Sequence, residues 1–151
     1  MDMRKTLVVA LIGAMAAGAM VGGATIAFAQ GNAIADRKEN RKQSGAAMRA
    51  IKAVIDNKGN TRDVIPHAAK LKELELAHVK MYPAGSGTGD TKALPVIWTD
   101  WRGFEAASKA TADAADALAV AAGSGDLAAV GTAFGAVGRT CGACHDKYRA
   151  K

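Results

Sequence analysis

The sequence is poor in the residues that mark several common classes of protein. Phe, Tyr and Trp together make up 5% of its 151 residues, and there are only 2 cysteines and 3 prolines. The basic residues are scattered among acidic ones and form no stripe interleaved with aromatic side chains, so no nucleic-acid partner is expected despite a formal charge of +6. The glycines after Pro83 lack the Lys and the Ser or Thr that complete a phosphate-binding loop. The length suits a single domain.

The N-terminus has the pattern of an export signal. Arg4 and Lys5 precede a stretch, residues 6–35, that contains no charged residue, and Ala27-Phe28-Ala29 offers small residues at the positions that a signal peptidase reads. We therefore expect residues 1–29 to be a cleaved signal peptide and residues 30–151 to be a mature periplasmic domain. The alternative is an uncleaved membrane anchor, because the uncharged run is long enough to span a bilayer.

The mature sequence divides into four helical stretches separated by clusters of helix-breaking residues. We expect helices over residues 33–56, 62–82, 96–122 and 127–151, with Asp126 as the N-cap of the last one. Four helices joined mostly by short connections predict an all-α, antiparallel up-down-up-down bundle. Ala is abundant and aromatic residues are few, so the core would bury little area, and a large apolar group between the helices would remedy that.

The last helix carries the attachment pattern of a c-type haem, Cys-x-x-Cys-His, in Cys141, Cys144 and His145. Two thiols three residues apart lie on the same side of a helical turn, where they can add to the two vinyl groups of the porphyrin, and the adjacent imidazole can ligate the iron. We therefore predict one covalently bound haem c. The alternatives are a redox disulfide, which usually follows a strand and opens a helix, and a zinc site, which needs further ligands.

The position of this motif near the C-terminus, followed by Tyr148-Arg149, resembles the class II c-type cytochromes, the cytochrome c′ family. The resemblance covers nearly all of the mature chain and includes several further positions: Arg37, Gly45, Met48, Ile51, residues 89–91 and residues 95–98. It implies a four-helix bundle with a covalently bound haem, often a homodimer that packs through its first two helices.

The resemblance also locates the second axial position of the iron, four residues after Arg37. Low-spin members of the family have a methionine there and high-spin members an apolar residue, whereas this sequence has Arg41. Arginine stays protonated and is a poor iron ligand, so we expect a five-coordinate, high-spin iron. The alternative ligands are Met48, which at this spacing is more often core, and His78, which is more often a surface or hydrogen-bonded histidine. We expect His67 to face solvent.

Arg37 and Arg41 fall on the stripe of the first helix that should face the core. Either this half of the helix protrudes into solvent with its long side chains snorkelling, or Arg37 pairs with a haem propionate, which suits a guanidinium. Arg41 would then lie on the distal side of the haem or reach outward past it. Asp90 is assigned to cofactor binding at the haem edge together with Thr91, although loop residues of these types often make only local turns.

Two residues flank the predicted site and have two interpretations each. Trp98 can pack against the porphyrin or fasten the start of the third helix. Arg149 lies one turn beyond His145, where it can flank the proximal face of the haem or interact with the helix C-terminus.

These features predict an electron-transfer protein that passes electrons to a redox partner protein and is not an enzyme. The alternative is binding, scavenging or sensing of nitric oxide or carbon monoxide at an open iron site. A peroxidase activity lacks support because no distal histidine with a nearby acid is evident, although Arg41 could polarise a bound peroxide.

Overall fold

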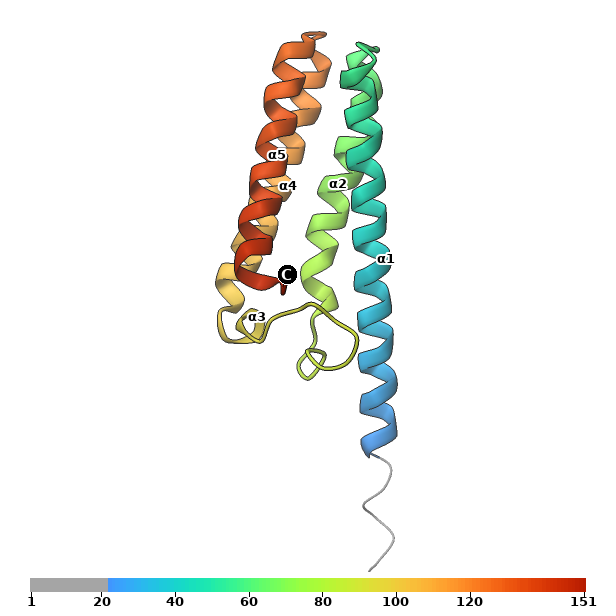
Figure 1. The fold of residues 1–151 in the computed structure, drawn as a ribbon, viewed down its shortest axis with the longest axis vertical. Coiled ribbons are helices and arrows are strands. Elements are labelled where there is room, and N and C mark those ends of the chain that lie inside the picture. The colour runs from blue at the N-terminus through green and yellow to red at the C-terminus, as the bar shows by residue number, and fades with distance from the viewer. Residues whose placement is uncertain (1–21) are drawn as a thin grey trace, which may run out of the picture.

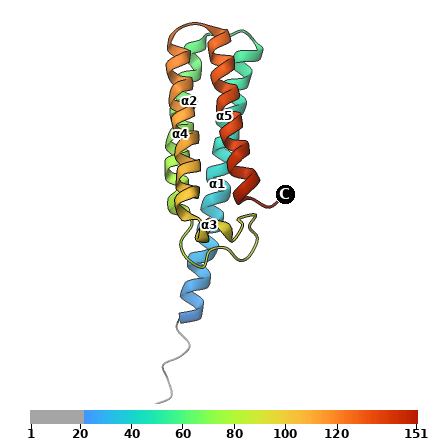
Figure 2. The same ribbon diagram turned by 90° about the vertical axis from the view of Figure 1, so that its left-hand side faces the viewer.

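The computed structural model describes residues 22–151 of the chain. Its elements in chain order are α1 (Gly22–Asp56), the 3₁₀ helix η1 (Thr61–Asp63), α2 (Val64–His78), the 3₁₀ helix η2 (Val79–Met81), α3 (Val96–Thr99), α4 (Trp101–Gly123) and α5 (Leu127–Tyr148). The four long helices lie side by side and alternate in direction, and the loop before α3 closes one end of the bundle (Figures 1 and 2). The predicted all-α, up-down-up-down bundle is confirmed. In this part of the chain, extended pairing is limited to one bridge between Ala93 and Arg149.

The helix ends follow from local sequence. Asp126 is the N-cap of α5, as predicted, and its carboxylate accepts hydrogen bonds from the backbone N–H groups of Ala128 and Ala129 at 2.8 and 3.2 Å. Gly125 precedes it with a φ of 81°, a left-handed conformation that glycine adopts without strain. These two residues turn the chain from α4 directly into α5, which makes the two helices antiparallel neighbours.

The single helix predicted over residues 96–122 is wrong, because the structure interrupts it at Asp100. The backbone there has φ −122° and ψ 53°, which is not helical. The Asp100 carboxylate accepts hydrogen bonds from the Tyr148 hydroxyl at 2.7 Å and from Lys147 Nζ at 2.6 Å. It folds back over Gly103, where any Cβ atom would overlap the Asp100 and Tyr148 oxygens. A contact with the end of α5, remote in sequence, therefore sets where α4 begins.

The last helix also ends earlier than predicted, at Tyr148 rather than at the end of the chain. Beyond it the backbone pairs with the loop before α3. The Leu94 N–H donates to the Tyr148 carbonyl at 3.1 Å, and the Ala150 N–H donates to the Lys92 carbonyl at 2.8 Å. The C-terminal residues are thus used to fasten this loop across the end of the bundle.

Most of the predicted signal peptide lies outside the described residues, which begin at residue 22. The backbone of α1 starts there, before the predicted helix start at residue 33. Across residues 22–151, none of the helices combines the length and the hydrophobicity needed to cross a membrane. The cut after Ala29 stays a prediction.

Two buried clusters lie at different levels along the bundle. An aliphatic cluster joins all four long helices near the α1–α2 and α4–α5 turns. Its buried members are Ala47, Ile51, Val64, Ala68, Leu71, Ala115, Leu118, Ala122, Val130 and Val137. A smaller aromatic cluster, built on Ile97, Phe104 and Tyr148, lies at the end that the loop covers. Between the two levels, polar and charged side chains such as Arg37, Arg41, Glu75 and His78 face inward beside apolar ones.

The aliphatic cluster should supply much of the stability of the bundle. Leu118 is 0% exposed, so shortening it in Leu118→Ala leaves a cavity and should lower the free energy of unfolding by about 2–5 kcal/mol. Leu76→Ala is the matched control, because Leu76 is 50% exposed and the change should cost less than about 0.5 kcal/mol. Guanidinium titrations followed by circular dichroism measure both, and equal losses would contradict the assignment of the core.

Candidate functional site

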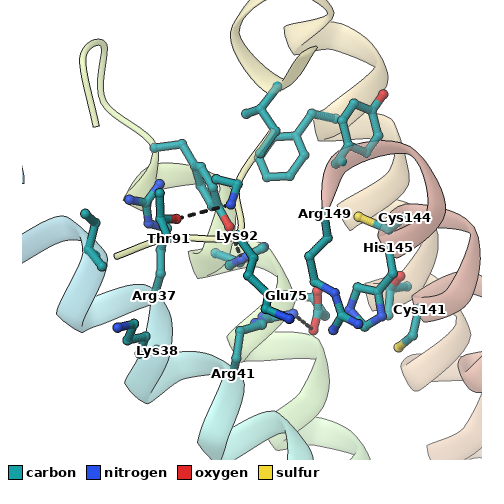
Figure 3. A pocket seen from close by; sticks show the side chains of 18 of the residues that line it. Arg37, Lys38, Arg41, Glu75, Thr91, Lys92, Cys141, Cys144, His145 and Arg149 are labelled. Carbon is teal, nitrogen blue, oxygen red and sulfur yellow. Dashed lines mark hydrogen bonds and ion pairs between the residues drawn. The ribbon is translucent and has the colours of Figure 1, made fainter. Parts of the chain in front are cut away.

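A cavity of about 400 Å³ lies between the aliphatic and aromatic clusters, which is within the usual size range of cofactor pockets (Figure 3). Its walls come from α1, α2, the loop before α3, α4 and α5. Helices α1 and α5 make few contacts with each other, whereas α2 and α4 pack closely. The cavity is therefore an opening between the first and last long helices, lined by side chains that are distant in sequence.

The helix α5 brings Cys141, Cys144 and His145 to the same wall of the cavity, as the spacing of three and four residues predicts (Figure 3). All three side chains are half-buried. Burial raises the pKa of both thiols, so they stay protonated at neutral pH. Redox-active Cys-x-x-Cys pairs instead have a lowered thiol pKa. The surroundings of Cys141 and Cys144 therefore do not support the redox-disulfide alternative.

The His145 imidazole is kept in its neutral form. Burial lowers its pKa, and the nearby positive charges of Arg149 and Arg41 lower it further. Neutral imidazole is the form that ligates a metal. Within residues 22–151, no three His, Cys, Asp or Glu side chains come together in a way that would hold a bare metal ion, so the zinc alternative lacks a ligand set. His145 is instead suited to ligate a metal that a larger cofactor carries.

Arg37 is buried, not solvated as the snorkelling alternative requires. Its side chain is 4% exposed, and its guanidinium carbon lies 4.5 Å from the centre of the Tyr82 ring. Nη2 donates a hydrogen bond to the Ser86 carbonyl at 2.7 Å, whereas Nε has no acceptor among the described residues. Burial lowers its pKa, and the tyrosine opposes this shift. A buried guanidinium with an unused donor and no carboxylate partner in the described chain suits an anionic group of a ligand.

Arg41 also lines the cavity, on the side opposite to His145 (Figure 3). Its Nη1 donates to Glu75 Oε1 at 2.8 Å, and its Nε donates to Asn40 Oδ1 at 2.9 Å. Glu75 is 5% exposed, and burial raises its pKa while Arg41 opposes the shift. Asn40 is itself fixed, because its Nδ2 donates to the Leu74 carbonyl on α2 at 3.0 Å. Where the resembled family has a methionine or an apolar residue, this chain thus has an arginine that is fixed in an ion pair.

His78 is buried in the same wall and is not a surface residue. It is 6% exposed, and one ring nitrogen lies 2.8 Å from the Tyr82 hydroxyl. Burial lowers the pKa of His78 to about 3, and the charges of Arg41 and Arg37 contribute to this shift. The ring is therefore neutral and hydrogen-bonded, which agrees with the interpretation of His78 as a hydrogen-bonded histidine.

The remaining predicted residues separate into two groups. Asp90 and Arg149 line the cavity at its solvent-exposed rim, where Asp90 pairs with Lys38 at 2.5 Å and is 95% exposed. This carboxylate points to a lysine and to water, so its assignment to cofactor binding stays a prediction without geometric support. Trp98 and Met48 do not line the cavity. Trp98 Nε1 donates to the carbonyls of residues 82 and 83 at 3.2 Å, which fastens the start of α3, and Met48 packs against the aliphatic cluster.

His67 is only half-buried and lies outside the cavity.

Glu75 is the residue that the sequence analysis missed. The inward positions of the second helix recur at steps of three and four and change along it from apolar to polar: Val64, Ala68, Leu71, Glu75, His78 and Tyr82. A carboxylate in such a stripe marks a buried polar site.

The cavity suits a haem in its donor set and in its lining. One wall offers two thiols and a neutral imidazole, another offers a buried guanidinium for a carboxylate, and the aromatic cluster supplies apolar surface from Ile97, Phe104 and Tyr148.

Comparison with known proteins gives a consistent set of relatives. A profile of the family described as Cytochrome C′ matches residues 32–149. A cytochrome c′ from Pararhodospirillum photometricum is 36% identical over 117 residues, which cover 75% of this chain and 92% of that protein. A cytochrome c-556 from Agrobacterium fabrum is 33% identical over 151 residues, which cover 97% and 96%. The crystal structure of cytochrome c′ from Thermochromatium tepidum matches with a TM-score of 0.74 at 28% identity, over 81% of this chain and 97% of that one.

Two further solved structures concern ligands and assembly. One is a nitric oxide complex of a mutant cytochrome c′ from Alcaligenes xylosoxidans, with a TM-score of 0.72 and 28% identity over 81% of this chain and 97% of that one. The other is a cytochrome c′ with an unusual ligand-controlled dimer dissociation, with a TM-score of 0.74 and 30% identity over the same shares of both chains.

The buried histidine of the cavity should make stability depend on pH. His78 stays neutral in the folded protein down to about pH 3, whereas in the unfolded chain it takes up a proton below its ordinary pKa of 6.5. Stability present at neutral pH is therefore lost as the pH falls from 6.5 toward 3, by about 2 kcal/mol at about pH 5. Glutamine cannot titrate. Between neutral pH and about pH 5, the free energy of unfolding of His78→Gln should therefore fall by about 2 kcal/mol less than that of the wild type.

Guanidinium denaturation titrations at neutral pH and at about pH 5 measure this difference between the variant and the wild type. The control is His67→Gln, on the same helix but outside the cavity, which should keep the pH dependence of the wild type. If His78→Gln and the wild type lose equal stability on acidification, the burial of a neutral His78 is wrong.

Proposed function

Because the chain belongs to the cytochrome c′ family, we propose that Cys141 and Cys144 hold one haem c, that His145 ligates its iron, and that the protein transfers electrons. The observation that supports this most is the convergence of the three side chains on one wall of a cavity of suitable size. A haem bound there supplies an iron that alternates between the ferric and ferrous states. The residues of the chain fasten it, ligate it and set the charge around it.

Arg37 is the residue best suited to receive a carboxylate of the haem. It is buried, its Nε has no acceptor among the described residues, and Ser86 and Tyr82 hold the rest of the guanidinium in place. Pairing with a propionate would satisfy the unused donor and neutralise the buried charge.

In this proposal the chain is not an enzyme, because an electron passes through and no substrate is changed. Its partner is another redox protein. The exposed rim of the cavity carries Lys38, Lys92 and Arg149 against a single carboxylate, Asp90, and this positive excess favours approach of an acidic partner. Export to the periplasm and cleavage after Ala29 belong to the same proposal, and the signal-like sequence of residues 1–29 supports them.

Binding of nitric oxide or carbon monoxide is the second candidate function, favoured by the residue opposite His145. Arg41 cannot ligate iron, so a haem in this cavity would have an open sixth position. The nitric oxide complex of a related protein supports a small gas as ligand. A homodimer through α1 and α2 is part of this proposal, and the ligand-controlled dimer of another relative supports it.

The attachment can be tested by intact mass after export from a host with haem-attachment machinery. The wild type should exceed its polypeptide mass by one haem even after denaturation, because thioether bonds survive unfolding. The variant Cys141→Ser/Cys144→Ser should have the polypeptide mass alone. Met48→Leu is the control, since Met48 is a half-buried sulfur residue outside the cavity and should leave both mass and spectrum unchanged. A bare polypeptide mass for the wild type would contradict the proposal.

The open position can be tested with Arg41→Met. The resemblance to low-spin members of the family implies that a methionine at this site ligates iron, so the absorption spectrum should change from high-spin to low-spin. Arg49→Met is the matched control, because Arg49 is exposed on the same helix and lies outside the cavity. If Arg41→Met stays high-spin like the control, Arg41 does not face the iron.

A further inference from the structure

The wall opposite His145 contains an ion pair whose carboxylate is buried. Arg41 and Glu75 come from different helices, and their side chains are 33% and 7% exposed, so the carboxylate is buried and the guanidinium only partly so. Burying the Glu75 carboxylate costs desolvation energy that an ion pair need not repay, and apolar residues of similar volume often stabilise a protein as well or better. The pair is therefore better explained by what it does in the cavity than by stability.

The guanidinium of Arg41 is held in one orientation, but not all of its N–H donors have an acceptor among the described residues. Arginine has five N–H donors. Hydrogen bonds to Asn40 and Glu75 engage Nε, Nη1 and Nη2 once each, which leaves two N–H groups without an acceptor in the described part of the chain. Asn40 is anchored to the backbone of α2, so Arg41 is positioned before any ligand arrives.

The cavity as a whole carries an excess of positive charge. Among its lining residues are five cations, Arg37, Lys38, Arg41, Lys92 and Arg149, and only two carboxylates, Glu75 and Asp90. The excess of three positive charges exceeds the two negative charges of a pair of haem propionates, and a ferric iron adds to it. Negative charge entering this space is therefore favoured electrostatically.

We propose that Arg41, oriented by Asn40 and Glu75, makes the open position opposite His145 selective for small anions over neutral gases. The ligand class is a small monoanion that binds ferric iron and accepts a hydrogen bond, for which fluoride and azide are probes. Arg41 donates to the bound anion, while Glu75 competes for the same guanidinium and limits the affinity. This inference rests on the proposed haem site and adds its ligand selectivity.

Substitutions of the two partners should have opposite effects. Arg41→Gln removes the donor cation and should weaken fluoride binding to the ferric protein by about tenfold or more. Glu75→Gln removes the competing carboxylate and should strengthen fluoride binding. Arg41→Gln/Glu75→Gln leaves no unpaired buried charge, so it guards against misfolding, and it should bind fluoride as weakly as Arg41→Gln. Arg49→Gln, an equal charge change on an exposed part of α1, is the matched control and should match the wild type.

Dissociation constants come from absorption titrations of the ferric protein with fluoride, repeated with azide. Carbon monoxide binding to the ferrous form is the reference for a neutral ligand. In each variant its dissociation constant should change far less than that of the anions. Equal fluoride affinity in the wild type and Arg41→Gln, or a change of the same sign in Arg41→Gln and Glu75→Gln, would overturn the inference. An exported protein without a haem spectrum would instead overturn the proposed function, so the two failures are distinguishable.

Discussion

The structure depends on keeping α1 and α5 apart while the bundle stays folded. The aliphatic cluster joins all four long helices at one end, and the aromatic cluster closes the other. At the level between them, every helix replaces apolar inward residues by polar ones, and a cavity of about 400 Å³ opens. A space of this size has lost packing contacts, which is costly unless a ligand fills it. The interrupted core is therefore suited to take up a ligand.

Different walls of the cavity carry different kinds of side chains. The helix α5 carries the groups that can attach and ligate a cofactor, all within residues 141–145. The helices α1 and α2 carry the charged pair Arg41 and Glu75, which Asn40 helps to hold in place. The end of α5 also fastens the loop before α3, through the backbone pairing of residues 92–94 with 148–150. In the proposed function, one helix thus holds the cofactor and completes the enclosure, while the facing helices set the charge that a ligand would meet.

Features that arise within one helix could be predicted from the sequence. The shared face of Cys141, Cys144 and His145 needs only helical geometry, and the N-cap at Asp126 needs only a local preference. Features that depend on partners far along the chain could not. The Arg41–Glu75 pair joins residues 34 positions apart, and the break at Asp100 depends on a hydrogen bond with Tyr148, 48 positions away. The arginines on the core stripe of α1 indicated a conflict, but only the packing of α2 and the loop decides that Arg37 is buried.

The proposed function requires a haem fastened to α5, with His145 on its iron and no side chain ligating the iron from the opposite side. The most direct test is the absorption spectrum of the exported wild-type protein, recorded oxidised and reduced. The account predicts a coloured protein with a high-spin haem c spectrum in both states, which shifts when a ligand is added. A colourless protein, or a low-spin spectrum with a methionine-to-iron band, would contradict it.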